Sequence, residues 1–281
     1  MPKGVLPNNT ESCPLRQVLS FRRRFSEDST IPMTPATAAL LVVAAFVAGA
    51  MNAVAGGGSF ITFPALVFTG VPSVVANASS TVAICPGALA SAVAYRKDFQ
   101  NFKGVSFRAM LAVSLAGGVV GALLLLLTPE RTFDGVIPWL LLMATLVFIF
   151  APKLTPALQR RVKIGPGTLL VVQFFVAVYG GYFGGAIGIM MLSAWALFGL
   201  TDLKAMNATK TVLSGALNGV AVVLFIAAGK VWWPQTLVML VGSVTGGYLG
   251  AHYARGIDQR YIRAAIIAIS VAMTVLFFAR G

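Results

Sequence analysis

The chain has 281 residues, of which 58% are hydrophobic and only 10% are charged, and its formal net charge is +13. Soluble domains carry about a quarter charged residues, so this composition excludes a soluble protein and predicts an integral membrane protein. The excess of lysine and arginine does not indicate nucleic-acid binding, because these residues lie between apolar segments rather than on one soluble face. The lipid bilayer is the partner that the composition predicts.

Residues 1–32 differ in character from the rest of the chain. They are polar, contain scattered proline and asparagine, and show no apolar period, so we expect a disordered N-terminal extension. Residues 22–25 resemble a twin-arginine signal only weakly, since no clear small-residue cleavage site follows the next apolar run. Translation that begins at Met1 and translation that begins at Met33 are both compatible with the sequence.

Ten apolar segments follow the extension. They cover residues 36–55, 59–70, 73–95, 107–127, 136–151, 167–183, 189–199, 205–228, 236–254 and 261–279. Eight approach spanning length, whereas segments 59–70 and 189–199 have about a dozen residues, or roughly 18 Å of helix against a hydrocarbon core of about 30 Å. The sequence therefore predicts an all-α integral membrane protein with two short helices that cannot span alone.

The segments form two similar halves, 33–151 and 152–281. Residues 77–82 (Asn-Ala-Ser-Ser-Thr-Val) match residues 207–212 (Asn-Ala-Thr-Lys-Thr-Val), which also aligns Gly58 with Gly188. With a one-residue gap, Ser114, Gly117, Gly118, Gly121 and Ala122 align with Ser243, Gly246, Gly247, Gly250 and Ala251. A duplicated membrane unit of this kind is typical of secondary transporters.

Charged residues between the segments predict the topology. The basic connections contain Arg96, Lys97, Lys103 and Arg108, then Lys153, Arg160, Arg161 and Lys163, then Arg255, Arg260 and Arg263. Lysine and arginine collect in short cytoplasmic loops, and all three connections lie on one face if each half crosses the membrane five times. Because an odd number of crossings reverses the second half, the sequence predicts two inverted five-segment repeats.

A glycine cluster precedes each short segment. The first cluster is Gly56, Gly57 and Gly58, and the second contains Gly180, Gly181, Gly184 and Gly185. Interrupted backbone at membrane depth is tolerated only where protein or a water-filled cavity covers it, so these breaks indicate the substrate site. Helices that begin near Ser59 and near Gly188 would direct free N–H groups and partial positive charge into the membrane.

Lys210 is the charge within an apolar segment that most needs an explanation. It lies about 12 Å along a helix that we expect Asp202 to cap, and an ammonium at that depth costs about 2.5 to 3.5 kcal/mol unless it is paired or hydrated. No carboxylate in the segment is available to pair with it. A bound anion is the partner that this arrangement favours.

Polar residues continue the same helix face. Asn207, Lys210, Thr211, Ser214 and Asn218 follow helical spacing, and Asn77, Ser80 and Thr81 form the matching stripe in the first half. The candidate substrate-binding set is therefore Gly56, Gly57, Gly58, Ser59, Asn77, Ser80, Thr81, Gly184, Gly185, Gly188, Asn207, Lys210, Thr211 and Ser214.

Each of these features also has a purely structural interpretation. Lys210 would then extend its amine to a membrane interface, and the Asn, Ser and Thr side chains would hold helices together. Glycine favours close helix packing, which is the better explanation for the glycines of segments 107–127 and 236–254. Those two segments would pack either within one subunit or between two subunits of a homodimer.

Residue types that carry chemistry are rare. No apolar segment holds a carboxylate in its interior, His252 is the only histidine, and Cys13 and Cys85 do not form a metal or disulfide pair. The sequence therefore predicts no catalytic residues, no metal site, no cofactor and no carboxylate relay for a coupling ion, and it argues against an enzyme.

The motifs together resemble one family of membrane permeases. Residues 53–60 (Ala-Val-Ala-Gly-Gly-Gly-Ser-Phe), residues 76–81 leading to Pro86 and Gly87, and residues 207–211 are similar to the sulfite exporter TauE/SafE family over about residues 33–281. The resemblance implies transport of anionic sulfur compounds, sulfite or organosulfonates such as sulfoacetate, across the bacterial inner membrane.

The sequence thus predicts a multi-pass secondary transporter that exports a small sulfur-containing anion by alternating access. Lys210 would neutralise the anion, Asn77, Thr81, Asn207 and Thr211 would donate hydrogen bonds, and the glycine-led helix ends would complete the site. A passive anion channel and a carrier of a different small organic anion are the alternatives. Counterflow separates a carrier from a channel, because only a carrier exchanges faster when substrate is present on the far side.

Overall fold

The computed structural model describes residues 33–54, 57–94, 104–159, 165–200, 202–253 and 259–280. Contacts divide the chain into Met1–Thr34 and Pro35–Gly281, and every helix named below belongs to the second unit. The predicted N-terminal extension, residues 1–32, and the predicted site residue Gly56 lie outside the described residues.

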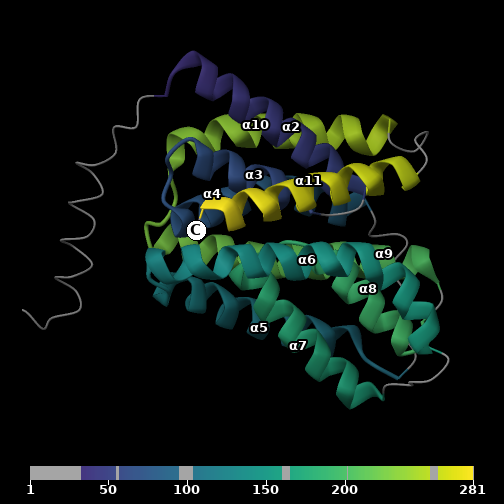
Figure 1. Ribbon diagram of the computed structural model, residues 1–281. Coiled ribbons are helices and arrows are strands. Elements are labelled where there is room, and N and C mark those ends of the chain that lie inside the picture. The colour runs from purple at the N-terminus through teal and green to yellow at the C-terminus, as the bar shows by residue number, and fades with distance from the viewer. Residues whose placement is uncertain are drawn as a thin grey trace, which may run out of the picture. The chain divides into compact units, whose positions relative to one another are not determined.

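Every apolar segment predicted from the sequence forms a helix, and the described residues contain no β-strand. In chain order the helices are α2 (Pro35–Val54), α3 (Ser59–Phe68), α4 (Ser73–Ala94), α5 (Phe107–Leu127), α6 (Glu130–Gln159), α7 (Pro166–Tyr182), α8 (Ile187–Leu197), α9 (Leu203–Ala227), α10 (Trp233–Tyr253) and α11 (Gln259–Arg280) (Figure 1). α6 extends well beyond the predicted run 136–151 at both ends, because a helix continues through polar turns that hydropathy alone does not include.

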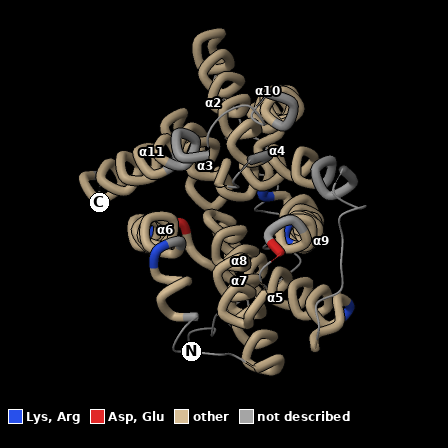
Figure 2. Tube along the Cα trace, turned by 90° about the vertical axis from the view of Figure 1, so that its right-hand side faces the viewer, with Lys and Arg blue, Asp and Glu red and all other residues tan. Residues whose placement is uncertain are grey.

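Helix length and hydropathy identify four candidate membrane spans among the described residues. These are Pro35–Asn52, Phe107–Leu127, Glu130–Ala151 and Ala205–Ala227. α3 and α8 have 10 and 11 residues, which corresponds to about 15 to 17 Å, so neither spans a bilayer alone. The two short helices predicted after the glycine clusters are therefore present. The described helices carry almost no charge along their lengths (Figure 2).

Two helix pairs form opposite edges of the bundle. α2 packs along α10, and α5 packs along α7 (Figures 1 and 2). Glycine permits both approaches, since a Cβ at Gly246 would overlap the Phe46 carbonyl and a Cβ at Gly121 would overlap the Val178 carbonyl. The glycine-rich faces of α5 and α10 thus pack within one chain, the first of the two arrangements that the sequence left open. A homodimer stays a prediction.

α4 and α9 contact each other between these edges. α5 also packs on α9, and α10 packs on α4. α6 contacts α8 and α11, and α11 contacts α3. The hydroxyls of Thr145 in α6 and Thr274 in α11 are 3.2 Å apart, which adds a buried hydrogen bond to the α6–α11 contact.

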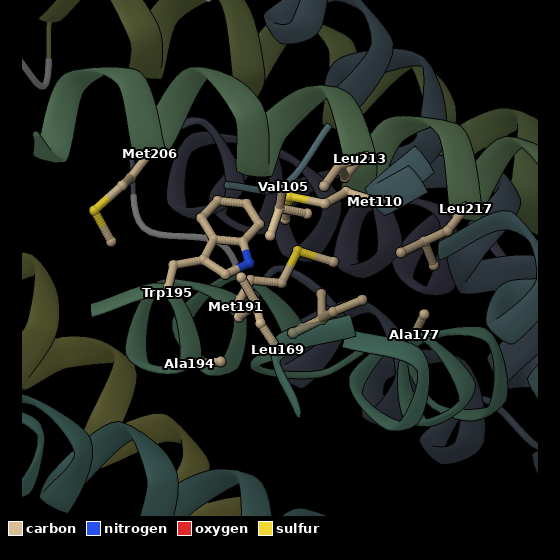
Figure 3. Close-up of a cluster of buried hydrophobic side chains, with 11 residues drawn as sticks. Val105, Met110, Leu169, Ala177, Met191, Ala194, Trp195, Met206, Leu213 and Leu217 are labelled. Carbon is tan, nitrogen blue, oxygen red and sulfur yellow. The ribbon is translucent and has the colours of Figure 1, made fainter. Parts of the chain in front are cut away.

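A buried apolar cluster fixes α8 against α5, α7 and α9 (Figure 3). Trp195 and Met191 of α8 pack there with Leu213 and Leu217 of α9 and Leu169 of α7. Gln173 forms polar contacts within this cluster: its Nε2 donates to Ser114 Oγ at 2.9 Å, and its Oε1 accepts from Trp195 Nε1 at 3.1 Å. Buried amides normally have partners, and here both ends of the Gln173 amide are bonded.

We expect Gln173→Leu to destabilise the protein by about 1 to 3 kcal/mol, because it removes the Gln173 amide oxygen that accepts from the Trp195 indole N–H within an apolar cluster. Thermal unfolding in detergent measures the effect. The double variant with Trp195→Phe should lose less than the two single variants added together, since it removes both partners of the Trp195–Gln173 hydrogen bond. Additive losses would contradict this explanation.

Candidate substrate site

The break between α2 and α3 depends on glycine geometry. Gly57 has φ +97°, a left-handed conformation that favours glycine. A Cβ on Gly58 would come within 2.7 Å of the Ala48 carbonyl of α2. α3 then begins at the buried Ser59, and no side chain caps its N-terminus. The N–H groups of Phe60 and Ile61 already donate to the carbonyls of Gly57 and Gly58, so the Ser59 N–H is the donor of the first turn that is left for a ligand.

The break between α7 and α8 follows the same plan. Gly184 has φ +82°, and Ala186, which precedes α8, is also left-handed with φ 59°. No side chain caps the N-terminus of α8 either. Both short helices therefore begin without a side-chain cap at the glycine breaks, as an anion site at these positions requires.

The two breaks lie against each other. A Cβ placed on Gly184 would be 3.7 Å from Ser59 Oγ, and one placed on Gly185 would be 3.3 Å from the Phe60 ring. The start of α3 thus lies beside the loop that leads into α8, with room for little more than the glycine hydrogens between them. Segments far apart in sequence bring the first and second predicted glycine clusters together.

Lys210 lies directly over the start of α8. A Cβ on Gly188 would be 3.0 Å from Lys210 Cδ and 3.6 Å from Lys210 Cε, so the absence of a side chain at Gly188 makes room for the lysine. Lys210 Nζ donates to Asn207 Oδ1 at 3.1 Å, one turn earlier in α9. The predicted cap is present as well, because Asp202 Oδ1 accepts from the Ala205 N–H at 3.1 Å.

The other predicted polar residues of α9, Thr211 and Ser214, lie on the same half-buried face as Lys210. Thr211 Oγ1 donates to the Asn207 carbonyl at 2.8 Å, and Ser214 Oγ approaches Met191 Sδ of α8 at 3.8 Å. Thr211 would have to exchange this bond within its own helix for a bond to a ligand. Asn207 is already the acceptor for Lys210 through Oδ1, so only its Nδ2 is available as a donor.

The matching polar stripe in α4, formed by Asn77, Ser80 and Thr81, is buried. Asn77, Ser80 and Thr81 are only 1%, 0% and 7% exposed. Asn77 Nδ2 donates to the Tyr182 carbonyl at the end of α7 at 2.8 Å, while its buried Oδ1 has no partner in the described structure. Thr81 Oγ1 donates to the Asn77 carbonyl at 2.9 Å. Asn77 therefore joins the first predicted half to the break in the second.

Ser80 occupies the position that Lys210 has in the other half. The hydroxyls of Ser80 and Thr62 are 2.6 Å apart, and Thr62 Oγ1 donates to the Gly58 carbonyl at 3.2 Å. Sequence reasoning did not select Thr62, although it is a polar residue one turn into a short apolar helix. A buried hydroxyl pair thus replaces the ammonium in this half.

Glu130 also carries a role that the sequence did not suggest. Its Oε2 accepts from the Val74 N–H at 2.7 Å, so a side chain at the start of α6 caps α4. The described residues contain no group of three His, Cys, Asp or Glu side chains that would hold a metal ion. The charge most suited to a ligand in this region is therefore the Lys210 ammonium.

Helical spans, paired breaks and a lysine over a helix start together define a multi-pass membrane transporter. The family described as sulfite exporter TauE/SafE matches residues 41–277, and the chain belongs to this family. The match covers the whole described bundle except parts of its first and last helices.

Several curated relatives are similar along most of the chain. A "probable membrane transporter protein" of Haemophilus influenzae is 33% identical over 239 residues, covering 84% of this chain and 92% of the relative. "Probable membrane transporter protein ORF9" of Sinorhizobium sp is 32% identical, covering 86% and 92%. YfcA of Escherichia coli, with the same description, is 28% identical, covering 88% and 91%. No solved structure matches the chain.

Proposed function

We propose that this transporter is a secondary carrier that exports small sulfur-containing anions, sulfite or organosulfonates similar to sulfoacetate, across the bacterial inner membrane by alternating access. The family's description names sulfite export, and the resemblance to the family implies the organosulfonates and the bacterial inner membrane. The single observation that carries the proposed site is the contact between the Lys210 side chain and Gly188 at the first turn of α8.

Charge supports an anion as the ligand. Lys210 Nζ is bonded to a neutral amide oxygen of Asn207 rather than to a carboxylate, so its charge is uncompensated within this contact. The N-termini of α3 and α8 add partial positive charge from two directions, because the two breaks touch through Ser59 and Gly184. An oxyanion head between these groups would accept hydrogen bonds from backbone N–H groups and from the ammonium.

The candidate residues have different roles in this proposal. Lys210 neutralises the anion, and the glycine-led starts of α3 and α8 surround it. Asn207 positions the ammonium and donates through Nδ2, and Thr211 donates after releasing the Asn207 carbonyl. Asn77 and Thr81 act from the first half when that stripe becomes accessible.

The helix contacts support two inverted repeats of five helices, α2–α6 and α7–α11. Exchange of the two groups converts most of these contacts into others that are present, for example α2–α10 into α7–α5, α4–α10 into α9–α5, and α3–α11 into α8–α6. The α4–α9 and α6–α11 contacts convert into themselves. Such an exchange is the basis of alternating access around a fixed site.

The membrane potential supplies a driving force for export. An inside-negative potential favours anion exit by about 2.3 kcal/mol per charge per 100 mV. We infer that export in this direction needs no coupling ion.

Flux into proteoliposomes tests the function. We expect uptake of labelled sulfite or sulfoacetate to saturate with concentration and to accelerate when the vesicles contain the same anion. Linear uptake without such acceleration would indicate an anion channel. Absence of sulfur-anion flux together with saturable flux of a carboxylate such as acetate would overturn the proposed cargo.

A further inference from the structure

The two matching polar stripes differ in accessibility. Asn77, Ser80 and Thr81 of α4 are at most 7% exposed, whereas their counterparts Asn207, Lys210 and Thr211 of α9 are half-buried. A face that carries an ammonium does not contact lipid tails without a large cost, so the exposed part of the α9 stripe faces an aqueous space. The α9 stripe is therefore partly open, and the α4 stripe is closed.

The stripes lie toward opposite ends of the bundle. Asn77 is about one turn from the start of α4, and Lys210 is about two turns from the start of α9. The start of α4 lies beside Glu130, and the N–H of Trp232, which follows the end of α9, donates to Ser79 in the second turn of α4. α4 and α9 therefore run antiparallel, with the closed stripe near Glu130 and the open stripe near the other end.

At the end of the bundle where Glu130 lies, hydrogen bonds connect segments that are far apart in the sequence. The backbone N–H of Trp232, just before α10, donates to Ser79 Oγ of α4 at 2.8 Å. Burial lowers the pKa of Lys230, and the attraction of Glu130 opposes that shift. Glu130 also caps α4 through Val74. Residues 230–232 are thus held on α4 and α6.

We propose that Glu130, Ser79 and Lys230 form a gate, that this gate is closed in the structure, and that its opening exposes the α4 stripe while the α9 stripe closes. This inference rests on the proposed carrier function. It assigns a role in transport to three residues that do not contact the anion. It also assigns the present structure to the state in which Lys210 is reached from the end where α9 begins.

Thiol labelling of the full-length protein in proteoliposomes, without substrate, tests the gate. Cysteines are introduced separately as Ser80→Cys and Thr211→Cys after Cys13→Ser and Cys85→Ser. We expect a charged methanethiosulfonate to modify position 211 at least about tenfold faster than position 80. Glu130→Gln should raise the rate at position 80 and lower it at position 211, each about fivefold, the factor that corresponds to an interaction of about 1 kcal/mol.

Two further variants keep the test decisive. Lys230→Gln leaves the Val74 cap intact and should reproduce the shift even if Glu130→Gln folds poorly. Lys153→Gln removes an exposed charge from the far part of the same helix and should leave both rates unchanged. Equal labelling of positions 80 and 211 before any gate substitution, or rates that Glu130→Gln and Lys230→Gln do not alter, would overturn the gate.

The labelling experiment tests the gate and the flux experiment tests the proposed function, so the two proposals can be contradicted independently. If the rates shift as expected but no sulfur anion is carried, the cargo is wrong and the gate stands. If Lys210→Ala abolishes sulfur-anion flux while the rates do not respond to the gate variants, the gate is wrong and the proposed function stands.

Discussion

Lys210→Ala is expected to reduce sulfur-anion flux in proteoliposomes by at least about a hundredfold. The substitution removes the ammonium together with the side chain that passes over Gly188 at the first turn of α8. Truncating one partner of a buried, hydrogen-bonded charge pair costs about 2 to 5 kcal/mol, and about 3 kcal/mol corresponds to a factor of more than a hundred. Initial rates of uptake of labelled sulfite or sulfoacetate measure the loss.

Matched variants separate charge from structure in this experiment. Lys153→Ala removes an exposed lysine from the end of α6 and should retain full flux. Lys210→Arg keeps the charge but presses a wider group against Gly188, so we expect partial flux. The unfolding temperature of Lys210→Ala should be close to that of the parent, since the variant releases an unneutralised charge. Undiminished anion flux in Lys210→Ala would discredit the site.

Gly246→Ala is expected to destabilise the bundle by about 3 kcal/mol or more. The added Cβ would overlap the carbonyl of Phe46, and neither backbone can move without separating α2 from α10. Overpacking a core by one methyl group costs about 1 to 3 kcal/mol where side chains can adjust, and here the obstacle is backbone. The midpoint of thermal aggregation in detergent and the monodisperse yield report the change.

Gly219→Ala is the matched control for Gly246→Ala. Gly219 is also helical, but a Cβ there would meet nothing within 4 Å, so the same change should leave the midpoint unchanged or slightly raised. Gly121→Ala, whose Cβ would overlap the Val178 carbonyl on the opposite edge, should resemble Gly246→Ala. Equal midpoints for Gly246→Ala and Gly219→Ala would show that close α2–α10 packing is not required.

The positions of the helices were largely predictable from the sequence, because each membrane helix is encoded by a long apolar run. The short lengths of α3 and α8 followed from the glycine clusters, and the Asp202 cap followed from its position before an apolar segment. The packing role of Gly121 and Gly246 followed from their spacing, since small residues on one helix face let another helix approach. All of these signals are local in the sequence.

The partners of the candidate site residues were not predictable in the same way. Asn77 bonds a backbone carbonyl of Tyr182, and a carbonyl has no residue-specific signature in a sequence. Ser80 pairs with Thr62, and Glu130 caps α4 from the start of α6. Each contact depends on how distant helices pack, which neither apolar period nor residue spacing specifies. The difference in exposure between Ser80 and Lys210 likewise depends on how the helices pack.

The pairing of α2 with α10 has a consequence for how the chain is made. A ribosome delivers α2 to the membrane early, but the glycine face that fits it arrives only when almost all other helices have been synthesised. Until then α2 has no partner for that surface, and lipid or an insertion factor must cover it. Nascent chains released before α10 should therefore remain loosely assembled and susceptible to membrane proteases.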